Sequence, residues 1–164
     1  MELQRKLHRT DRILMVIIAV GFLLNTYAFY VELKHEYDPS YQALCDVNSV
    51  ISCTKVITTK WGKGFGILPE SVAFRNPIFG FVFYTLMLLM IMAIKPNIIV
   101  CKSIIFLAIL SNLATIYLSI LMIYIIQYFC LICIISYIVN FLLLIYSIVR
   151  YQLLKQLKSK SKLR

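Results

Sequence analysis

Four of the five cysteines in this chain stand in two closely spaced pairs. Cys130 and Cys133 form a Cys-x-x-Cys motif, whereas Cys45 and Cys53 are separated by seven residues. Residues three apart lie on one face of a helix, so the sulfur atoms of Cys130 and Cys133 can pair. A helix N-terminus also lowers the pKa of a nearby thiol, which makes a nucleophilic thiolate. The motif therefore predicts thiol-disulfide chemistry, with two ordinary buried cysteines as the structural alternative.

The second pair admits two roles that spacing alone does not separate. Cys45 and Cys53 either form a structural disulfide in a flexible loop or carry electrons from a soluble thiol partner to the Cys-x-x-Cys pair. A four-cysteine zinc site is disfavoured, because its knuckles usually hold about two to four intervening residues. The connectivity stays open, since four cysteines allow three pairings. The fifth cysteine, Cys101, is predicted to be a small apolar residue at a helix end.

Long apolar segments must position these cysteines. Hydrophobic residues make up 61% of the 164 residues and charged residues 15%, against about half and about a quarter in soluble domains. About 20 helical residues cross a bilayer, with about 17 as the lower limit, and four segments reach that length: residues 13–31, 78–94, 103–126 and 129–149. The sequence therefore predicts an all-α membrane protein, a four-transmembrane-helix bundle in a single domain over residues 1–164. A luminal loop or cap, residues 32–77, connects its first two helices.

The positive charges predict the orientation of these spans. The net charge is +10, and Lys and Arg near membrane spans remain on the cytoplasmic side. Twelve of them flank one end of the predicted spans, including the basic tail 150–164, whereas five bases and five acids balance in residues 32–77. Both termini are therefore predicted to be cytoplasmic, with the paired cysteines on the luminal, oxidising side. The positive charge then reflects topology and contact with anionic membrane lipids, and it does not indicate nucleic-acid binding.

Polar and aromatic residues near the luminal side give weaker signals. Residues 61–66, Trp-Gly-Lys-Gly-Phe-Gly, lack the spacing of a phosphate-binding loop. Glycine permits sharp turns and aromatic rings favour the membrane interface, so this segment is predicted to be a lid or anchor over the bundle. Asn76 and Tyr137 either contact a ligand or satisfy helix packing and capping. No metal pair is predicted, because His8 and His35 fall on opposite sides of the membrane.

These motifs, in their order and spacing, resemble the vitamin K epoxide reductase family. The resemblance rests on Ala43-Leu44-Cys45-Asp46, Ile51-Ser52-Cys53, the run at 61–66, Asn76-Pro77-Ile78-Phe79-Gly80, and Phe129-Cys130-Leu131-Ile132-Cys133 with Tyr137. It implies a four-helix membrane enzyme of the endoplasmic reticulum, with its active site on the luminal side. Such an enzyme reduces vitamin K 2,3-epoxide to the quinone, and the quinone to the hydroquinone, in the vitamin K cycle that supports γ-carboxylation.

The resemblance also implies roles for individual residues. Cys130 and Cys133 are the catalytic pair, with Cys133 acting on the substrate. Cys45 accepts electrons from a luminal partner of the thioredoxin-like or protein disulfide isomerase type, and Cys53 passes them to Cys130. The implied substrate-binding residues are Asn76 and Tyr137, as hydrogen-bond donors, together with Phe79, Trp61 and Ile57. The quinone or epoxide is a substrate, no permanently bound cofactor or metal is expected, and coumarin anticoagulants such as warfarin are the implied inhibitors.

Two features qualify the resemblance, and two rival functions remain. Ile57 stands where the best-known family member carries Phe, which leaves inhibitor sensitivity open. Lys160 and Lys162, fifth and third from the end, resemble a dilysine retrieval signal of the endoplasmic reticulum. One rival is a quinone-linked oxidase that generates disulfides in secretory proteins with the same four cysteines. The other is a claudin-type junction protein, which is disfavoured because Trp61 follows the loop cysteines instead of preceding them.

Overall fold

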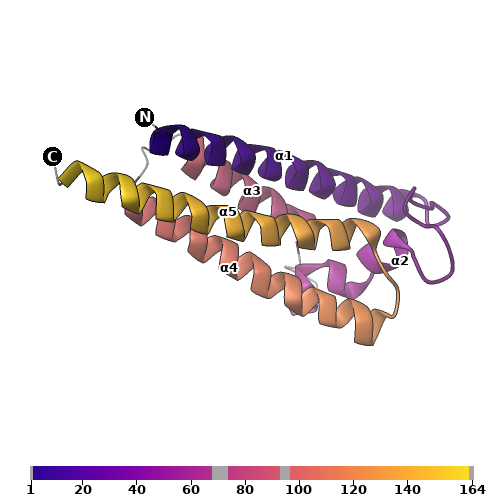
Figure 1. The fold of residues 1–164 in the computed structure, drawn as a ribbon. Coiled ribbons are helices and arrows are strands. Elements are labelled where there is room, and N and C mark those ends of the chain that lie inside the picture. Colours follow the sequence, from indigo (N-terminus) through magenta and orange to yellow (C-terminus); the bar gives the residue numbers. More distant parts are fainter. Residues whose placement is uncertain (1, 68–73, 93–96, 163–164) are drawn as a thin grey trace.

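The computed structural model describes residues 2–67, 74–92 and 97–162, most of which are helical (Figure 1). The four long helices are α1 (Glu2–Tyr37), α3 (Asn76–Met92), α4 (Ile98–Ile120) and α5 (Leu131–Lys162). A π-helical turn, η3 (Leu121–Ile126), continues α4. Shorter elements connect α1 to α3: helix α2 (Cys53–Ile57) and the 3-10 turns η1 (Lys60–Gly62) and η2 (Gly64–Gly66). The described residues form no strand beyond isolated bridges, which join Ile51 to Phe129 and Lys63 to Arg75.

The four long helices run side by side as a bundle (Figure 1). Helix α1 packs against both α5 and α3, and α4 packs against α5. The start of α1 and the end of α5 lie at one end of the bundle, and the short elements between α1 and α3 gather toward the other end (Figure 1). The predicted all-α fold is therefore confirmed for the described part of the chain.

Three helical stretches are long and apolar enough to cross a membrane, namely Glu2–Tyr37, Ile98–Ile126 and Leu131–Lys160. Helix α3 is apolar but shorter, at 17 residues. The last residue of its predicted span, Ile94, lies outside the described residues, and the count of four spans stays a prediction. Large apolar side chains point outward from the bundle, such as Phe106 at 65% exposure and Phe141 at 56%. Such surfaces are typical of proteins whose helices face lipid.

Helices α1, α4 and α5 extend beyond the predicted membrane spans, since α1 and α4 begin earlier, at Glu2 and Ile98. Helix α1 continues through residues 32–37, and α5 continues from residue 150 to Lys162. The connecting loop thus begins after Tyr37, and most of the basic tail is helical. Hydropathy identifies only the apolar part of a helix that is long enough to cross a bilayer. Glu32 and Leu154 lie outside those parts, but both are buried, so the helices pack against neighbouring elements there as well. Glu70, Lys95 and the end of the lysine motif at residues 163–164 lie outside the described residues.

Two apolar clusters organise the bundle. The central cluster joins all four long helices and includes Leu14, Met87, Ile104 and Leu143, each of which is fully buried. The second cluster contains Cys45, Cys53 and Cys130 among its buried residues. The loop cysteines are therefore part of the packed interior of the molecule.

Candidate active site

The loop after α1 places Cys45 and Cys53 in a disulfide whose Cα atoms are 5.7 Å apart. Cys53 begins α2, a helix whose N-cap is Ser52: the Ser52 hydroxyl accepts a hydrogen bond from the Lys55 amide at 3.2 Å. Cys53 is fully buried and Cys45 is 7% exposed. Leu44, directly before Cys45, is 91% exposed, so the disulfide lies just beneath the surface of the loop.

A single carboxylate, that of Asp46, organises this loop. One of its oxygens accepts hydrogen bonds from the Ser52 hydroxyl at 2.9 Å and the Thr54 amide at 3.0 Å. The other accepts from the Thr54 hydroxyl at 2.6 Å and the Ala43 amide at 2.9 Å. Burial by itself raises the pKa of Asp46, but these hydrogen bonds outweigh it and hold the pKa below its usual value. Asp46 is thus a charged hub that fixes both chain segments flanking the Cys45–Cys53 disulfide.

The Cys-x-x-Cys pair lies at the start of α5. A left-handed residue, Gln127 with φ 58°, ends η3, and α5 begins at Leu131. Cys130 occupies the N-cap position: its sulfur accepts a hydrogen bond from the Cys133 amide at 3.2 Å, and its carbonyl accepts from the Ile134 amide at 3.1 Å. Cys130 and Cys133 form a disulfide with Cα atoms 5.2 Å apart. The amide and the helix dipole both stabilise negative charge on the Cys130 sulfur when this disulfide opens.

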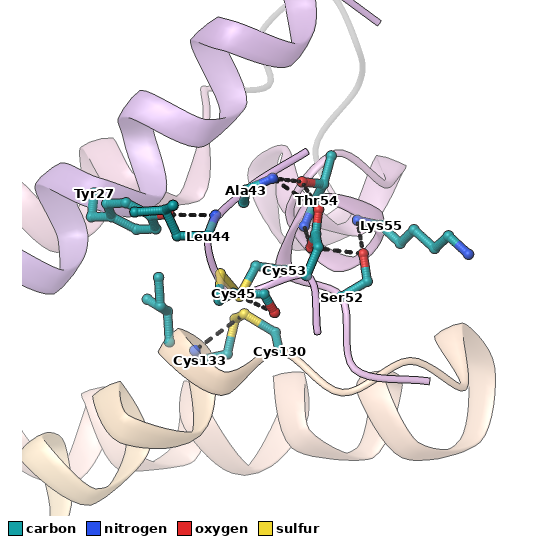
Figure 2. Close-up of a disulfide and its surroundings, with 12 residues drawn as sticks. Tyr27, Ala43, Leu44, Cys45, Ser52, Cys53, Thr54, Lys55, Cys130 and Cys133 are labelled. Carbon is teal, nitrogen blue, oxygen red and sulfur yellow. Dashed lines mark hydrogen bonds between the residues drawn. A yellow bond between two sulfur atoms is a disulfide. The ribbon is translucent and has the colours of Figure 1, made fainter. Parts of the chain in front are cut away.

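Backbone hydrogen bonds join the two cysteine pairs. The Ser52 amide donates to the Phe129 carbonyl at 2.9 Å, and the Phe129 amide donates to the Val50 carbonyl at 2.9 Å. The residue before Cys53 is thus bonded to the residue before Cys130. Figure 2 shows the two disulfides facing each other, and Cys53 and Cys130 belong to one buried cluster. This arrangement allows thiol-disulfide exchange between the pairs, which needs a thiolate close to a disulfide sulfur.

A cavity of about 500 Å³ lies between the four long helices and residues 56–65. Apolar side chains form most of its lining. Cys133 lines this cavity, whereas Cys130 is fully buried beside the loop disulfide. The two sulfurs of the motif therefore face in different directions, one toward the cavity and one toward the other cysteine pair. A cavity of this size and character is typical of sites for small apolar ligands.

All five residues that the sequence suggested for substrate binding line the cavity: Asn76, Tyr137, Phe79, Trp61 and Ile57. They come from α2, η1, α3 and α5, which are far apart in the sequence. The structure therefore brings them together with Cys133. Their roles in binding remain predictions.

Asn76 already has structural partners. Its amide nitrogen donates to the Trp61 carbonyl at 2.8 Å, and its amide oxygen accepts from the Phe65 amide at 2.9 Å. We refer to residues 61–66 as the lid, because Trp61 and Phe65 line the cavity. The Tyr117 hydroxyl also donates to the Phe65 carbonyl at 3.1 Å. Asn76 thus holds the lid, which leaves one amide hydrogen of its side chain for a ligand.

The lid needs its glycines. Gly64 and Gly66 adopt left-handed backbone conformations with φ of 55° and 68°, which glycine adopts without steric cost. A Cβ atom on Gly66 would lie 2.1 Å from the Trp61 ring, and one on Gly62 would lie 1.9 Å from the Ile57 carbonyl oxygen. The sequence-based prediction of sharp turns in this segment is confirmed.

We expect Gly66→Ala to displace the Trp61 ring from the cavity wall. A left-handed Ala costs about 1–2 kcal/mol, and the clash with the ring adds to this. The expected result is a red-shifted Trp61 emission and a KM for a quinone substrate raised about tenfold. Ile67→Ala is the control, because Ile67 has an ordinary φ of −101° and is 72% exposed. Equal emission spectra for the two variants would contradict the prediction.

Sequence reasoning missed a set of polar residues in the cavity. The Tyr84 hydroxyl donates to the Asn140 amide oxygen at 2.9 Å, and the Asn140 amide nitrogen donates to the Thr115 hydroxyl at 3.2 Å. All three residues line the cavity. Asn140 follows Tyr137 by three residues and Cys133 by seven, which places all three on one face of a helix. Helical spacing could therefore have identified Asn140. These bonds connect α3, α4 and α5 around the cavity.

The described residues contain no group of three or more His, Cys, Asp or Glu side chains that could hold a metal ion. His8 and His35 lie near opposite ends of α1. The polar groups that line the cavity include the Cys133 sulfur, hydroxyl groups and amide groups.

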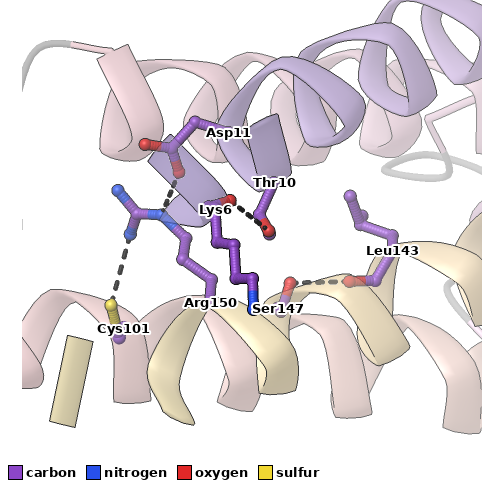
Figure 3. Close-up of polar contacts among 7 residues, drawn as sticks. All are labelled: Lys6, Thr10, Asp11, Cys101, Leu143, Ser147 and Arg150. Carbon is purple, nitrogen blue, oxygen red and sulfur yellow. Dashed lines mark hydrogen bonds and ion pairs between the residues drawn. The ribbon is translucent and has the colours of Figure 1, made fainter. Parts of the chain in front are cut away.

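The fifth cysteine packs with Leu7 of α1 and Leu154 of α5. These ends of the two helices lie opposite the short elements between α1 and α3 (Figure 1), and Figure 3 shows Cys101 beside Arg150. Cys101 is 1% exposed, as predicted for a small buried residue, and its sulfur accepts a hydrogen bond from the Arg150 guanidinium at 3.2 Å. Arg150 is itself 1% exposed and forms an ion pair with Asp11 at 2.7 Å. The group ties α1, α4 and α5 together.

We expect Asp11→Asn to destabilise the protein by about 3–5 kcal/mol, because it leaves the Arg150 charge buried without a counter-charge. Thermal unfolding in detergent measures this change. The control is Glu2→Gln, which removes an exposed ion pair with Lys6 one turn away and should leave the unfolding temperature unchanged. Equal unfolding temperatures for both variants would show that the Asp11 pair contributes nothing.

Residues 12–148 match the Vitamin K epoxide reductase family. The chain belongs to the vitamin K epoxide reductase family. Vitamin K epoxide reductase complex subunit 1 of Mus musculus is 31% identical over 141 residues, which cover 81% of this chain and 85% of that protein. The protein of the same name from Rattus norvegicus is 30% identical over 137 residues, which cover 79% of this chain and 83% of that protein.

Family membership confirms the resemblance drawn from the motifs, all of which lie within the matched segment. The chain is a membrane oxidoreductase of the vitamin K epoxide reductase type. The matched residues 12–148 include both cysteine pairs, the lid and every cavity residue named above.

Proposed function

We propose that this protein reduces vitamin K 2,3-epoxide to vitamin K quinone, and the quinone to the hydroquinone, by thiol-disulfide chemistry. One observation carries the proposal. The Cys130–Cys133 disulfide has one sulfur on an apolar cavity and the other against a second cysteine pair. A substrate in the cavity can therefore react with Cys133 while electrons arrive through Cys130.

The chemistry balances without a further cofactor. The reduced Cys130–Cys133 pair supplies two electrons and two protons when it closes to a disulfide. Quinone takes up both to become hydroquinone, whereas the epoxide takes up both to become quinone and water. In this scheme the Cys133 thiolate attacks the substrate. The Cys130 thiolate, stabilised by the helix N-terminus, then attacks the Cys133 sulfur and releases the product.

Two hydrogen-bond donors support this role for the cavity. The Tyr137 hydroxyl and the remaining amide hydrogen of Asn76 are available to substrate oxygen atoms, and both residues line the cavity. Donors aimed at an oxygen that gains negative charge stabilise the transition state, particularly where water is excluded. Phe79, Trp61 and Ile57 supply apolar contact for a naphthoquinone ring.

The electrons come, in this proposal, from a luminal thioredoxin-like or protein disulfide isomerase-type partner. Cys45 receives them, since it lies beside the exposed Leu44, and Cys53 passes them to Cys130. The proposed location is the membrane of the endoplasmic reticulum, with both termini cytoplasmic and the cavity near the luminal side. Coumarin anticoagulants such as warfarin are proposed to bind in the same cavity, under Ile57.

The test is turnover of vitamin K epoxide by membranes that contain this protein, with a small dithiol as the reductant. Quinone and hydroquinone should both form, and membranes from cells without the protein are the control. If neither product forms, the epoxide reductase proposal is wrong. Dithiol-independent oxidation of a reduced secretory protein, coupled to quinone consumption, would instead support the disulfide-generating oxidase.

A further inference from the structure

Residues 74–76, which we call the tether, contact the lid at the start of α3, whose first residue is Asn76. The Phe74 carbonyl accepts a hydrogen bond from the Gly64 amide at 2.7 Å. Asn76 bonds to the lid through both atoms of its side-chain amide, as described above. The residue between them, Arg75, also faces Lys63 in a backbone bridge. Each tether residue thus adjoins the lid, and the position of the tether sets the position of the lid.

Arg75 binds the tether to a different element, helix α1. Its Nε atom lies 3.2 Å from a carboxylate oxygen of Glu32, and its terminal nitrogen forms an ion pair with Glu36. The two acids are four residues apart, so one face of α1 presents both to the guanidinium. The guanidinium carbon also lies 6.0 Å from the centre of the Phe29 ring. Arginine suits this position, because its planar group can serve two carboxylates and an aromatic face together.

Burial distinguishes this contact from an ordinary surface ion pair. The Glu32 side chain is 4% exposed and that of Arg75 is 24% exposed, whereas that of Glu36 is 56% exposed. The Glu32 carboxylate oxygens form no hydrogen bond in the described structure, so Arg75 supplies their close counter-charge. A buried carboxylate without its partner carries a large desolvation penalty. Glu32 therefore keeps Arg75, and with it the tether, against α1.

We propose that Arg75 is a positioning residue for the cavity, which holds the lid closed through its ion pairs with Glu32 and Glu36. Arg75 does not line the cavity, whereas its neighbour Asn76 and the lid residues Trp61 and Phe65 do. Losing these two ion pairs, which we call the clamp, frees the tether, lets the lid move and exposes the cavity. The consequence for catalysis rests on the proposed function, but the consequence for the lid does not.

Trp61 is the single tryptophan of the chain and reports directly on the lid. The experiment measures acrylamide quenching of Trp61 emission in the full-length protein in detergent, for the wild type and for Arg75→Met. We expect the quenching constant to rise about twofold or more as the ring gains contact with water. The triple variant Glu32→Arg, Glu36→Gln and Arg75→Glu restores the ion pair in reverse without leaving Glu36 opposite a like charge, and its quenching should return toward the wild-type value.

Lys34→Met is the matched control. It removes a cation that stands between Glu32 and Glu36 on α1, and it leaves the tether and the lid unchanged. It should leave quenching unchanged. A circular dichroism spectrum and an unfolding curve show whether each variant is folded. The proposal is wrong if folded Arg75→Met has the wild-type quenching constant. It is also wrong if the variant with the reversed pair has the same quenching constant as Arg75→Met.

A kinetic measurement then relates the lid to substrate. With vitamin K quinone and a small dithiol, Arg75→Met should raise KM by about 10-fold to 100-fold, with recovery in the reversed pair and a smaller change in kcat. A change confined to kcat would contradict positioning by the lid. If the wild type lacks quinone turnover altogether, the proposed function fails, whereas the quenching result still decides the clamp.

Discussion

Cys133→Ala is expected to abolish reduction of both the epoxide and the quinone, whichever reductant is supplied. Among the described residues that line the cavity, Cys133 is the one cysteine. Its removal takes away the nucleophile that meets the substrate, and Cys130 cannot replace it because Cys130 is fully buried outside the cavity. Loss of a nucleophile costs at least about 10³-fold in turnover. Product formation in membranes, followed chromatographically with a small dithiol as reductant, measures the loss.

The matched control is Cys101→Ser, which removes the remaining thiol but keeps a hydrogen-bond acceptor for Arg150. It should turn over at the wild-type rate, because Cys101 packs with Leu7 and Leu154 and does not line the cavity. Retention of more than about a tenth of the wild-type rate by Cys133→Ala would show that the substrate reacts elsewhere. The thiol mechanism at the cavity would then be wrong.

The helices and the redox chemistry followed from the sequence because both depend on local patterns. Apolar segments of bilayer length marked most of α1, α4 and α5, and the Cys-x-x-Cys spacing placed two sulfurs on one helical turn. The glycines of the lid also carried a local signal, since Gly66 must adopt a positive φ. These features need no knowledge of which helices are neighbours.

The parts that depend on neighbouring helices could not be predicted in this way. Nothing local in the sequence shows that Asn76 bonds to the lid, or that Arg75 finds its partners 39 and 43 residues earlier in the chain. Likewise, hydropathy ended α1 at residue 31, because the burial of Glu32 depends on an arginine from another segment. Rotation of each helix about its axis, which sets these contacts, is fixed by packing across the whole bundle.

The motifs therefore identified the cavity residues through family resemblance, whereas the bonds that hold them come from the structure alone. Asn140 illustrates the difference. It shares a helix face with Cys133 and Tyr137, yet its partners Tyr84 and Thr115 lie on two other helices. Helical spacing can place Asn140 on that face, but its bonds to Tyr84 and Thr115 became visible only when three helices were placed together.

Cys45→Ala is expected to slow turnover when a protein is the reductant but not when a small dithiol is. With a thioredoxin-fold dithiol protein as the donor, turnover should fall at least about tenfold, because the relay loses the cysteine that accepts electrons near the loop surface. With a small dithiol, turnover should stay within about threefold of the wild type. A small dithiol can enter the cavity and reduce the Cys130–Cys133 disulfide at the Cys133 sulfur, without passing through the loop. Turnover of vitamin K epoxide under both donors measures the effect.

The same variant decides between the two roles that the sequence left open for this pair. A purely structural disulfide across residues 45–53 would stabilise the fold by about 2.5 kcal/mol. Its loss would then lower the unfolding temperature and reduce turnover equally with both donors. The control is Val47→Ala, which changes an exposed residue of the same loop, 66% accessible, and leaves both sulfurs in place. A relay predicts loss with the protein donor alone, because only a large donor, which cannot enter the cavity, depends on Cys45.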